Sequence, residues 1–219
     1  LRLQPTGLEG GPLILRPSMS SQFISALLIA SHGMALGLEM AIDGPMPSRP
    51  YVEMTVEAMR AFGAQVRVTE DWRGISVPRS ARYAAADYLV EPDASNASYF
   101  LAAAAILPGS RCRIEGLGRN SIQGDVKVAD LLERMGADVA VEADTITVVG
   151  REGLEGIDID LNDMPDMAMT LAAVALFAEG PTAIRNIGNL RVKETDRLAA
   201  LSVELARLGA PVTVDGDDL

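Results

Sequence analysis

The chain alternates between two spacings of its apolar residues. Segments in which apolar residues recur every three or four positions begin with polar residues and end near a glycine, and shorter segments that alternate apolar and polar residues follow them. The first spacing is typical of amphipathic helices and the second of half-buried strands. The predicted helices lie at 20–30, 95–106 and 165–178, and the strands that follow them lie at 38–42, 110–116 and 182–188. This regular alternation indicates an α/β fold.

The same pattern recurs at a constant interval. Three segments each consist of a helix end, a Gly-Ala pair and an alternating strand: 58–68, 131–141 and 204–214. Their glycines Gly63, Gly136 and Gly209 follow one another at intervals of 73 residues, and each suits a left-handed helix C-cap. A polar loop and then a second helix precede each of them, within 45–59, 119–135 and 189–205, and a further strand closes the first two copies. The predicted unit is therefore βαβαββ, repeated along the chain.

The helix starts and the ends of the array carry further expectations. Ser20, Ser95 or Asn96, and Pro165 match the preferences of helix caps and first turns. The third copy stops after one closing strand at Leu219, and a short Gly-rich stretch precedes the first copy, so the array is expected to be cut at both ends. Because the first residue is Leu rather than Met, an internal start or processing is expected.

Composition indicates a globular chain with two domains. Apolar residues make up 48% and aromatic residues only 4%, so aliphatic side chains and methionines must fill the core. Residues 1–90 hold 8 basic and 8 acidic side chains, whereas residues 91–219 hold 11 basic and 22 acidic ones and carry the whole net charge of −11. This change near Glu91 predicts two domains, 1–90 and 91–219.

Other features exclude several classes of function. An acidic chain without a basic stripe is unsuited to nucleic acid, and no apolar run reaches the roughly 18 residues of a membrane span. The single cysteine, Cys112, excludes an internal disulfide framework and favours a reducing, cytoplasmic compartment. Its alternating surroundings predict a strand position. His32, the only histidine, is expected near a helix end and offers no histidine-based metal site.

Polar residues gather at predicted helix starts, where free N–H groups and the helix dipole favour anions. Ser20, Ser21 and Gln22 open the first helix, and Ser48 and Tyr51 lie in a proline-stiffened loop before the second. Capping accounts for a single serine, and a surface turn is the alternative for the loop. Three consecutive polar side chains exceed what capping requires, so a ligand site is the other interpretation.

The third copy adds charged residues. Asp166 stands at a helix start, where the dipole stabilises a carboxylate. Lys193 and Arg197 are four residues apart and are expected on one helix face, with Glu194 turned about 100° away. Two cations in a first helical turn oppose the dipole unless they bind an anion. A solvated surface, with Glu194 and Asp196 as counter-charges, is an equal alternative.

The run NLRVKETDR at 189–197 closely resembles the hallmark of EPSP synthases, N-x-R-x-K-E-S/T-D-R. The segments MSSQF, PSRPY, EPDASNASYFLAAAAI and MPDMAMTLA resemble the same family in the same order, so the resemblance covers essentially all 219 residues. It implies a two-domain enolpyruvyl transferase fold of the inside-out α/β barrel type, in which three βαβαββ units build each domain. Residues 1–90 would be the later part of the shikimate 3-phosphate-side domain, and 91–219 the first two repeats of the second domain.

The resemblance also implies a reaction and its residues. Members of the family transfer the enolpyruvyl group of phosphoenolpyruvate to the 5-hydroxyl of shikimate 3-phosphate and release phosphate, with no metal or other cofactor. Asp166 is implied as the base that takes the 5-hydroxyl proton, and Glu194 as the acid/base that protonates the methylene carbon and later recovers a proton. Shikimate 3-phosphate would contact Ser20, Ser21, Gln22, Ser48, Tyr51, Asp166, Asn189 and Lys193, and phosphoenolpyruvate would contact Gln22 and Arg197.

The chain departs from the family at its ends. The family places a Lys and an Arg near its N-terminus, a further Arg ahead of the region present here, and an Arg and a Lys beyond Leu219. These are main phosphoenolpyruvate ligands, so the resemblance implies an internal fragment and leaves the activity of the chain alone undecided. The full-length form is implied to be a cytoplasmic monomer that binds neither nucleic acid nor membrane. The fragment is expected to self-associate or to pair with the missing segments.

Two other functions stay open. A UDP-N-acetylglucosamine enolpyruvyl transferase shares the fold, but it is expected to use a cysteine in its cleft and to lack the KETDR run. A non-catalytic module that binds shikimate 3-phosphate or a complementing chain is the second alternative.

Overall fold

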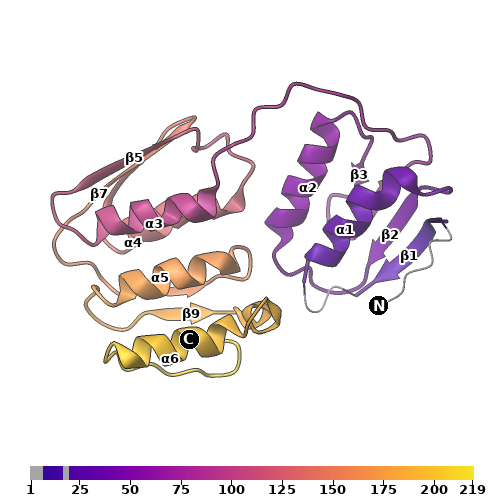
Figure 1. Cartoon of the computed structure of the whole chain (residues 1–219). Helices are drawn as coiled ribbons and strands as arrows, with labels where there is room; N and C mark the ends of the chain where they lie inside the picture. Colours follow the sequence, from indigo (N-terminus) through magenta and orange to yellow (C-terminus); the bar gives the residue numbers. More distant parts are fainter. Residues whose placement is uncertain (1–6, 17–19) are drawn as a thin grey trace. The chain divides into compact units, whose positions relative to one another are not determined.

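The computed structural model of the chain describes residues 7–16 and 20–219, and the chain divides into two compact units, Leu1–Leu89 and Val90–Leu219 (Figure 1). The elements of the first unit are, in order, β1 (Gly11–Leu15), α1 (Gln22–Ala30), η1 (Ser31–Gly33), β2 (Leu38–Ile42), α2 (Arg49–Ala61), β3 (Arg67–Val68) and β4 (Gly74–Val77). They build a sheet of order β1-β2-β4-β3, in which β1 and β2 are parallel and the other pairs antiparallel. This is the predicted βαβαββ unit.

The sheet of the first unit buries the face that α1 and α2 cover. Along β2, Leu38, Met40 and Ile42 are buried, whereas Glu39 and Ala41 are exposed, as the two-residue period of a strand requires. The buried side chains of both helices join the same apolar cluster. Each large aliphatic side chain buried in this way contributes roughly 1.5–3 kcal/mol, so the helices are held firmly and their starting residues have defined positions.

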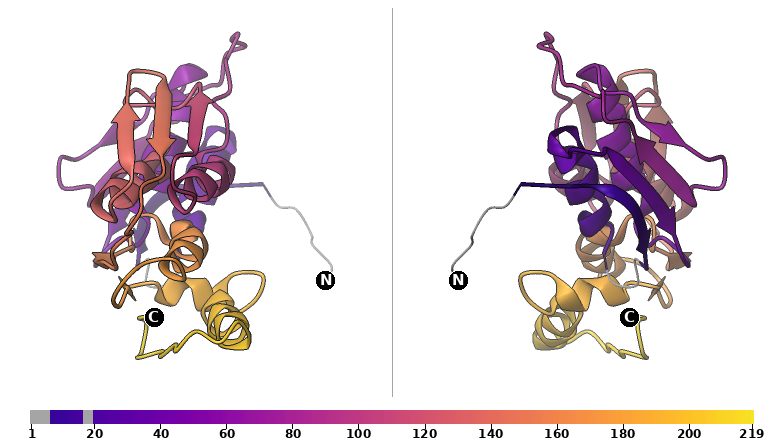
Figure 2. Two further views of the ribbon diagram at one scale, coloured as in Figure 1. Left: turned by 90° about the vertical axis from the view of Figure 1, so that its left-hand side faces the viewer. Right: turned by 90° about the vertical axis from the view of Figure 1, so that its right-hand side faces the viewer.

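The second unit contains two further sets of elements. The first set is α3 (Ala94–Ala105), β5 (Arg111–Glu115), η2 (Gly124–Lys127), α4 (Val128–Arg134), β6 (Asp138–Val141) and β7 (Thr145–Val149). The second set is β8 (Asp158–Asp160), η3 (Pro165–Met167), α5 (Ala168–Ala175), β9 (Ala183–Arg185), η4 (Gly188–Val192) and α6 (Arg197–Arg207). The strands β5-β7-β6 form an antiparallel sheet, visible in the left view of Figure 2, and β8 and β9 form a parallel pair.

One apolar core connects the two sets of elements in this unit. Leu101 of α3, Leu132 of α4 and Leu171 of α5 are almost completely buried in it. A hydrogen bond of 2.8 Å between the hydroxyls of Ser98 and Thr170 crosses this core and joins α3 to α5, which run side by side in Figure 1. A buried hydroxyl needs such a partner, because leaving it unpaired is costly.

Several local predictions are confirmed. The three glycines of the repeat have the positive φ of a left-handed C-cap: 82° at Gly63, 112° at Gly136 and 86° at Gly209. Cys112 lies on β5, and His32 lies in η1 directly after α1. No helix in the described part of the chain is long and apolar enough to cross a membrane.

Three local predictions are wrong. The second helix of the third copy, which was expected to hold both Lys193 and Arg197 near its start, begins only at Arg197, because residues Gly188–Val192 form a short 3-10 helix and the next four are not helical. The strand expected after Gly209 and Ala210, at 212–214, does not form. In the first two copies the corresponding strands, β3 and β6, pair with β4 and β7. Among residues 7–16 and 20–219, no strand offers the third copy such a partner. The N-cap of α3 is Asp93 rather than Ser95 or Asn96, because its carboxylate accepts hydrogen bonds from both of their backbone N–H groups.

Candidate active site

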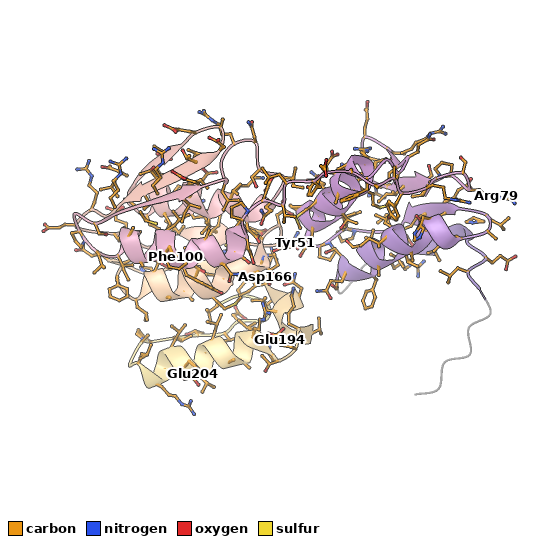
Figure 3. All side chains as sticks on the ribbon, turned by 45° about the horizontal axis from the view of Figure 1, so that its top comes forward. Tyr51, Arg79, Phe100, Asp166, Glu194 and Glu204 are labelled. Carbon is orange, nitrogen blue, oxygen red and sulfur yellow. The ribbon has the colours of Figure 1, made fainter. Side chains whose placement is uncertain are left out.

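Four charged side chains of the second unit form a cluster. Asp166 lies in η3, and its Oδ1 atom is 3.0 Å from Nη1 of Arg197 and 3.4 Å from Nζ of Lys193. Arg197 also contacts Glu194 with two nitrogens: Nε is 2.8 Å from Oε1 and Nη2 is 2.9 Å from Oε2. The guanidinium of Arg197 is therefore shared between two carboxylates that come from different loops. Figure 3 labels Asp166 and Glu194.

The members of this cluster differ in exposure. The side chains of Lys193, Arg197 and Asp166 are 19%, 26% and 27% exposed, whereas that of Glu194 is 67% exposed. The hydrogen bonds that Arg197 donates hold the pKa of the Glu194 carboxyl below its usual range, and the same bonds raise the pKa of Arg197. Glu194 is thus an exposed carboxylate, favoured in its charged form, beside a less exposed cation.

The parallel pair β8 and β9 explains why these residues meet. Parallel strands have their carboxyl ends at the same edge, and ligand-binding loops of α/β units start there. Asp166 comes from the loop after β8, and Lys193 and Glu194 come from the loop after β9. The topology therefore brings together segments that lie 27 or more residues apart in sequence.

Asp196 decides where α6 begins. Its backbone is extended, with φ −70° and ψ 90°, and its carboxylate accepts a hydrogen bond of 2.9 Å from the backbone N–H of Ala199. This is a regular N-cap, and it makes Arg197 the first residue of the helix. Lys193 is also extended, with φ −75° and ψ −161°. The expectation that Lys193 and Arg197 share a helix face is therefore wrong, although both cations meet at Asp166.

The remaining predicted residue of this unit is Asn189, which lies half-buried in η4. Its neighbour Leu190 is completely buried, which fixes the short helix against the core. Asp196, expected only as a counter-charge, is the N-cap of α6. The signal for that role was an Asp directly before an amphipathic helix.

In the first unit, the predicted ligand residues lie at the starts of α1 and α2. Ser20 accepts a hydrogen bond of 3.2 Å from the backbone N–H of Gln22, and Ser21 occupies the N-cap position. Ser21 is 4% exposed and Gln22 is exposed. The side chain of Ser20 therefore caps the helix, whereas Ser21 makes no capping hydrogen bond with its side chain. Capping does not account for the presence of Ser21 and Gln22.

Ser48 has an unusual backbone. It is the N-cap of α2 with φ 55° and ψ 41°, a left-handed conformation that few residues other than glycine adopt, and it is 5% exposed. Its carbonyl accepts a hydrogen bond of 3.1 Å from the backbone N–H of Tyr51. A strained residue at a helix start is a reason to suspect function. Figure 3 labels Tyr51.

The two loops of the first unit start at one edge of the sheet. Strands β1 and β2 are parallel, so α1 and α2 both follow their carboxyl ends. Arg16 and Asp43, the residues directly after these strands, form an ion pair of 2.7 Å across that edge. Farther along the helices, the hydroxyls of Ser25 and Thr55 are 2.8 Å apart and join α1 to α2. The serines at 20, 21 and 48 therefore belong to neighbouring loops.

Comparison with known proteins identifies the family. The family model described as EPSP synthase (3-phosphoshikimate 1-carboxyvinyltransferase) matches residues 2–219. The chain belongs to the EPSP synthase family. It is 47% identical over 220 residues to the 3-phosphoshikimate 1-carboxyvinyltransferase of Vibrio campbellii, and 50% identical over 213 residues to that of Edwardsiella ictaluri. These alignments cover 100% and 97% of the chain, and 50% and 49% of the two relatives.

Solved structures agree with the fold. The EPSP synthase of Acinetobacter baumannii matches with a TM-score of 0.74 and 27% identity over 96% of this chain and 48% of its own. The enolpyruvyl transferase NikO from Streptomyces tendae shares the fold with a TM-score of 0.63 and 23% identity, over 93% of this chain and 46% of its own. The chain thus has the enolpyruvyl transferase fold, and it spans about half the length of the EPSP synthases that it matches.

Proposed function

We propose that this chain supplies substrate-binding and acid/base residues of an EPSP synthase. The reaction transfers the enolpyruvyl group of phosphoenolpyruvate to the 5-hydroxyl of shikimate 3-phosphate and releases phosphate. The observation that carries the proposal is the sharing of the Asp166 carboxylate between Lys193 and Arg197, with Glu194 on the other side of Arg197. Two cations suit phosphorylated substrates, and two carboxylates in different environments suit a reaction with two proton transfers.

The proposal divides the substrates between the loops. For shikimate 3-phosphate, the first unit supplies the serines and Gln22 at the start of α1 and Ser48 and Tyr51 at the start of α2, and the second unit supplies Asn189, Lys193 and Asp166. For phosphoenolpyruvate, the first unit supplies Gln22 and the second supplies Arg197. Residues 1–90 belong to the shikimate 3-phosphate-side domain, and 91–219 are repeats of the other domain. The support is the match to EPSP synthases over the whole chain.

Asp166 acts as the base of the first step. Its carboxylate takes the 5-hydroxyl proton while the hydroxyl oxygen forms a bond to C2 of phosphoenolpyruvate. Lys193 and Arg197 hold the orientation of the carboxylate through Oδ1. A base must lie within hydrogen-bond reach of the proton that it takes, so fixing its orientation is part of the chemistry.

Glu194 needs a change of partner before it can donate a proton. In the structure, the hydrogen bonds from Arg197 lower its pKa, which is unfavourable for a general acid. An oxygen of phosphoenolpyruvate that binds Arg197 displaces Glu194, whose side chain is 67% exposed. Glu194, released from Arg197 and exposed to solvent, takes a proton from water and gives it to C3 as C2 forms its new bond. In the second step C3 returns the proton to Glu194, C2 and C3 regain their double bond, and phosphate leaves with the proton held by Asp166.

Binding measurements test the proposal directly. Isothermal titration calorimetry of this chain with shikimate 3-phosphate is expected to show binding, and shikimate without its phosphate is expected to bind much more weakly. The substitution Lys193→Met is expected to abolish most of the binding. Arg113→Gln, which removes an exposed arginine of β5 from the same unit, is the matched control and should leave binding unchanged. Equal binding of the two ligands, or of the Lys193 variant and the control, would refute the site.

A cytoplasmic location and a monomeric full-length enzyme complete the proposal. One cysteine in 219 residues supports the first. Size-exclusion chromatography with light scattering of a full-length enzyme tests the second.

A further inference from the structure

Arg191 connects three parts of the second unit, and no step of the proposed reaction uses it. Its Nη1 atom is 3.5 Å from Oδ2 of Asp196, and its Nε atom is 3.6 Å from Oδ1 of Asp217. Its Nη2 atom donates a hydrogen bond to the backbone carbonyl of Gly216. A planar guanidinium can bind several acceptors in fixed directions, which a lysine cannot do. The side chains of Arg191 and Asp196 are 37% and 40% exposed, so these ion pairs contribute little to stability.

The segment 215–219 gives Arg191 a fixed support. Leu219 and Ile184 exchange two backbone hydrogen bonds of 2.8 and 2.9 Å, and the N–H of Ile187 donates to the carbonyl of Asp217 at 2.9 Å. The segment therefore lies along β9 and its extension. Arg191 reaches from this segment to Asp196, and Asp196 is the N-cap of α6.

Gly188 provides independent support for this arrangement. A Cβ atom at Gly188 would lie 2.3 Å from Cγ and 2.4 to 2.5 Å from the carboxylate oxygens of Asp217. Only a residue without a side chain lets the Asp217 carboxylate lie so close to η4. In this position the carboxylate contacts Arg191. The Asp217 side chain is 65% exposed and can move aside, so a methyl group at Gly188 disturbs this contact without a clash in the core.

We propose that Arg191 is a positioning residue for the segment 193–197. It holds Asp196 in place, and Asp196 fixes the start of α6 at Arg197. The loop between Arg191 and Asp196 then presents Lys193 to Asp166 and Glu194 to Arg197. This inference rests on the proposed function, because it assigns the purpose of the contacts to substrate binding. It adds Arg191 and its supports Asp217 and Gly188, to which the proposed reaction gives no role.

Amide hydrogen exchange and calorimetry test the proposal on this chain. The backbone N–H of Ala199 donates a hydrogen bond to the carboxylate of Asp196. In Arg191→Gln, hydrogen exchange at this N–H is expected to become about tenfold faster. The affinity for shikimate 3-phosphate is expected to fall about tenfold, and the melting temperature to change by no more than about 2 °C, since exposed ion pairs stabilise little. Arg191→Lys should recover part of the affinity, because lysine keeps the positive charge but lacks the planar guanidinium that binds several acceptors at once. A purely structural role would lower the melting temperature and leave binding by the folded fraction unchanged.

Matched variants make the result decisive. Arg207→Gln removes an arginine whose partner Glu204 lies at the other end of α6, and it should change neither exchange at Ala199 nor binding. If Arg191→Gln fails to fold, Gly188→Ala tests the proposal in its place, because it moves Asp217 and leaves Arg191 unchanged. It is then expected to speed up exchange at Ala199 and to weaken the binding of shikimate 3-phosphate, each by less than tenfold. Normal exchange and normal affinity in Arg191→Gln, or in Gly188→Ala where that variant decides, would overturn the proposal.

The two proposals fail in different ways. If the unsubstituted chain binds no shikimate 3-phosphate, the proposed function fails for this chain, and with it the purpose assigned to Arg191. If the unsubstituted chain binds and the Arg191 variants bind equally well, the proposed function stands and only the positioning role is lost.

Discussion

Oδ1 of Asp166 lies 3.0 Å from Nη1 of Arg197, although 31 residues separate them in the chain. The same oxygen lies 3.4 Å from Nζ of Lys193. The contact joins the loop after β8 to the start of α6 inside one unit. Each of the two cations is about a quarter exposed or less, so the interaction is stronger than that of a surface pair. It makes Asp166 the centre of the charged cluster.

The first prediction concerns this carboxylate. Asp166→Asn keeps the shape and one oxygen acceptor but removes the base, so the turnover of a full-length enzyme that carries this sequence should fall by about 10²–10⁴-fold. Steady-state kinetics measures this. Asp163→Asn, an exposed carboxylate of the same loop, should retain normal turnover. Similar kinetics in the two variants would exclude Asp166 as the base.

The second prediction separates binding from catalysis at Glu194. Glu194→Gln in the same full-length enzyme removes the group that exchanges a proton with carbon, so turnover should fall by about 10²–10⁴-fold while the Kd of shikimate 3-phosphate stays within about a factor of three. Turnover assays and calorimetry measure the two effects. A parallel loss of turnover and affinity would instead indicate a binding role.

Glu204 offers a close control for that experiment. It pairs with Arg207 at 2.5 Å with the same three-residue spacing that separates Glu194 from Arg197, and both carboxylates are mostly exposed. Figure 3 shows Glu204 toward the opposite end of α6 from Glu194. Glu204→Gln removes an equivalent ion pair far from the cluster and should leave turnover unchanged.

The third prediction concerns the cap of α3. Asp93 accepts hydrogen bonds from the backbone N–H groups of Ser95 and Asn96 at 2.9 and 3.3 Å, and from both of their side chains. Asp93→Ala should therefore lower the free energy of unfolding by about 1–2 kcal/mol. Urea unfolding measures this, with Glu152→Ala, an exposed loop residue, as a control expected to lie within about 0.5 kcal/mol of the unsubstituted chain. Equal stability of the two variants would mean that the cap is replaced by solvent.

The repeat of the fold could be predicted from sequence because each copy encodes it locally. The apolar periods and the glycines at 73-residue intervals specify helices, C-caps and strands without reference to distant residues. The strand at 212–214 could not be judged in this way, because a strand exists only through its partner. In the first two copies, similar alternating residues form strands because they pair with β4 and β7.

The candidate site shows a similar limit. The resemblance to the EPSP synthase motifs indicated Asp166, Lys193, Glu194 and Arg197, but their geometry depends on a single capping interaction. With Asp196 as N-cap, Lys193 lies before the helix, and it meets Arg197 only through Asp166. Sequence spacing of four residues was therefore a misleading guide to proximity, whereas the parallel pairing of β8 and β9 was the cause of it.

The last prediction is a pH dependence of stability that centres on Glu91. Its carboxylate accepts hydrogen bonds from the hydroxyl of Ser121 at 2.5 Å, the side-chain amide of Gln123 at 2.9 Å and the backbone N–H of Ile122 at 3.1 Å. Burial acts to raise the pKa of Glu91, but these hydrogen bonds outweigh it, so the pKa is lowered. The carboxylate thereby ties the first residues of the second unit to the loop before η2.

The sign of the effect follows from linkage. A carboxyl whose pKa is lower in the folded state contributes stability that is fully present above its unfolded pKa, about 4.3 for Glu, and that is lost as the pH falls through the folded value. Urea unfolding of this chain should therefore give equal free energies at pH 7 and 6 and a decline below about pH 4.5. Glu91→Gln should lower the value at pH 7 by about 1–3 kcal/mol and make the decline shallower. Glu115→Gln, an exposed glutamate of β5, should keep the slope of the unsubstituted chain. A Glu91→Gln curve parallel to that control at every pH would show that the hydrogen bonds do not favour the charged form.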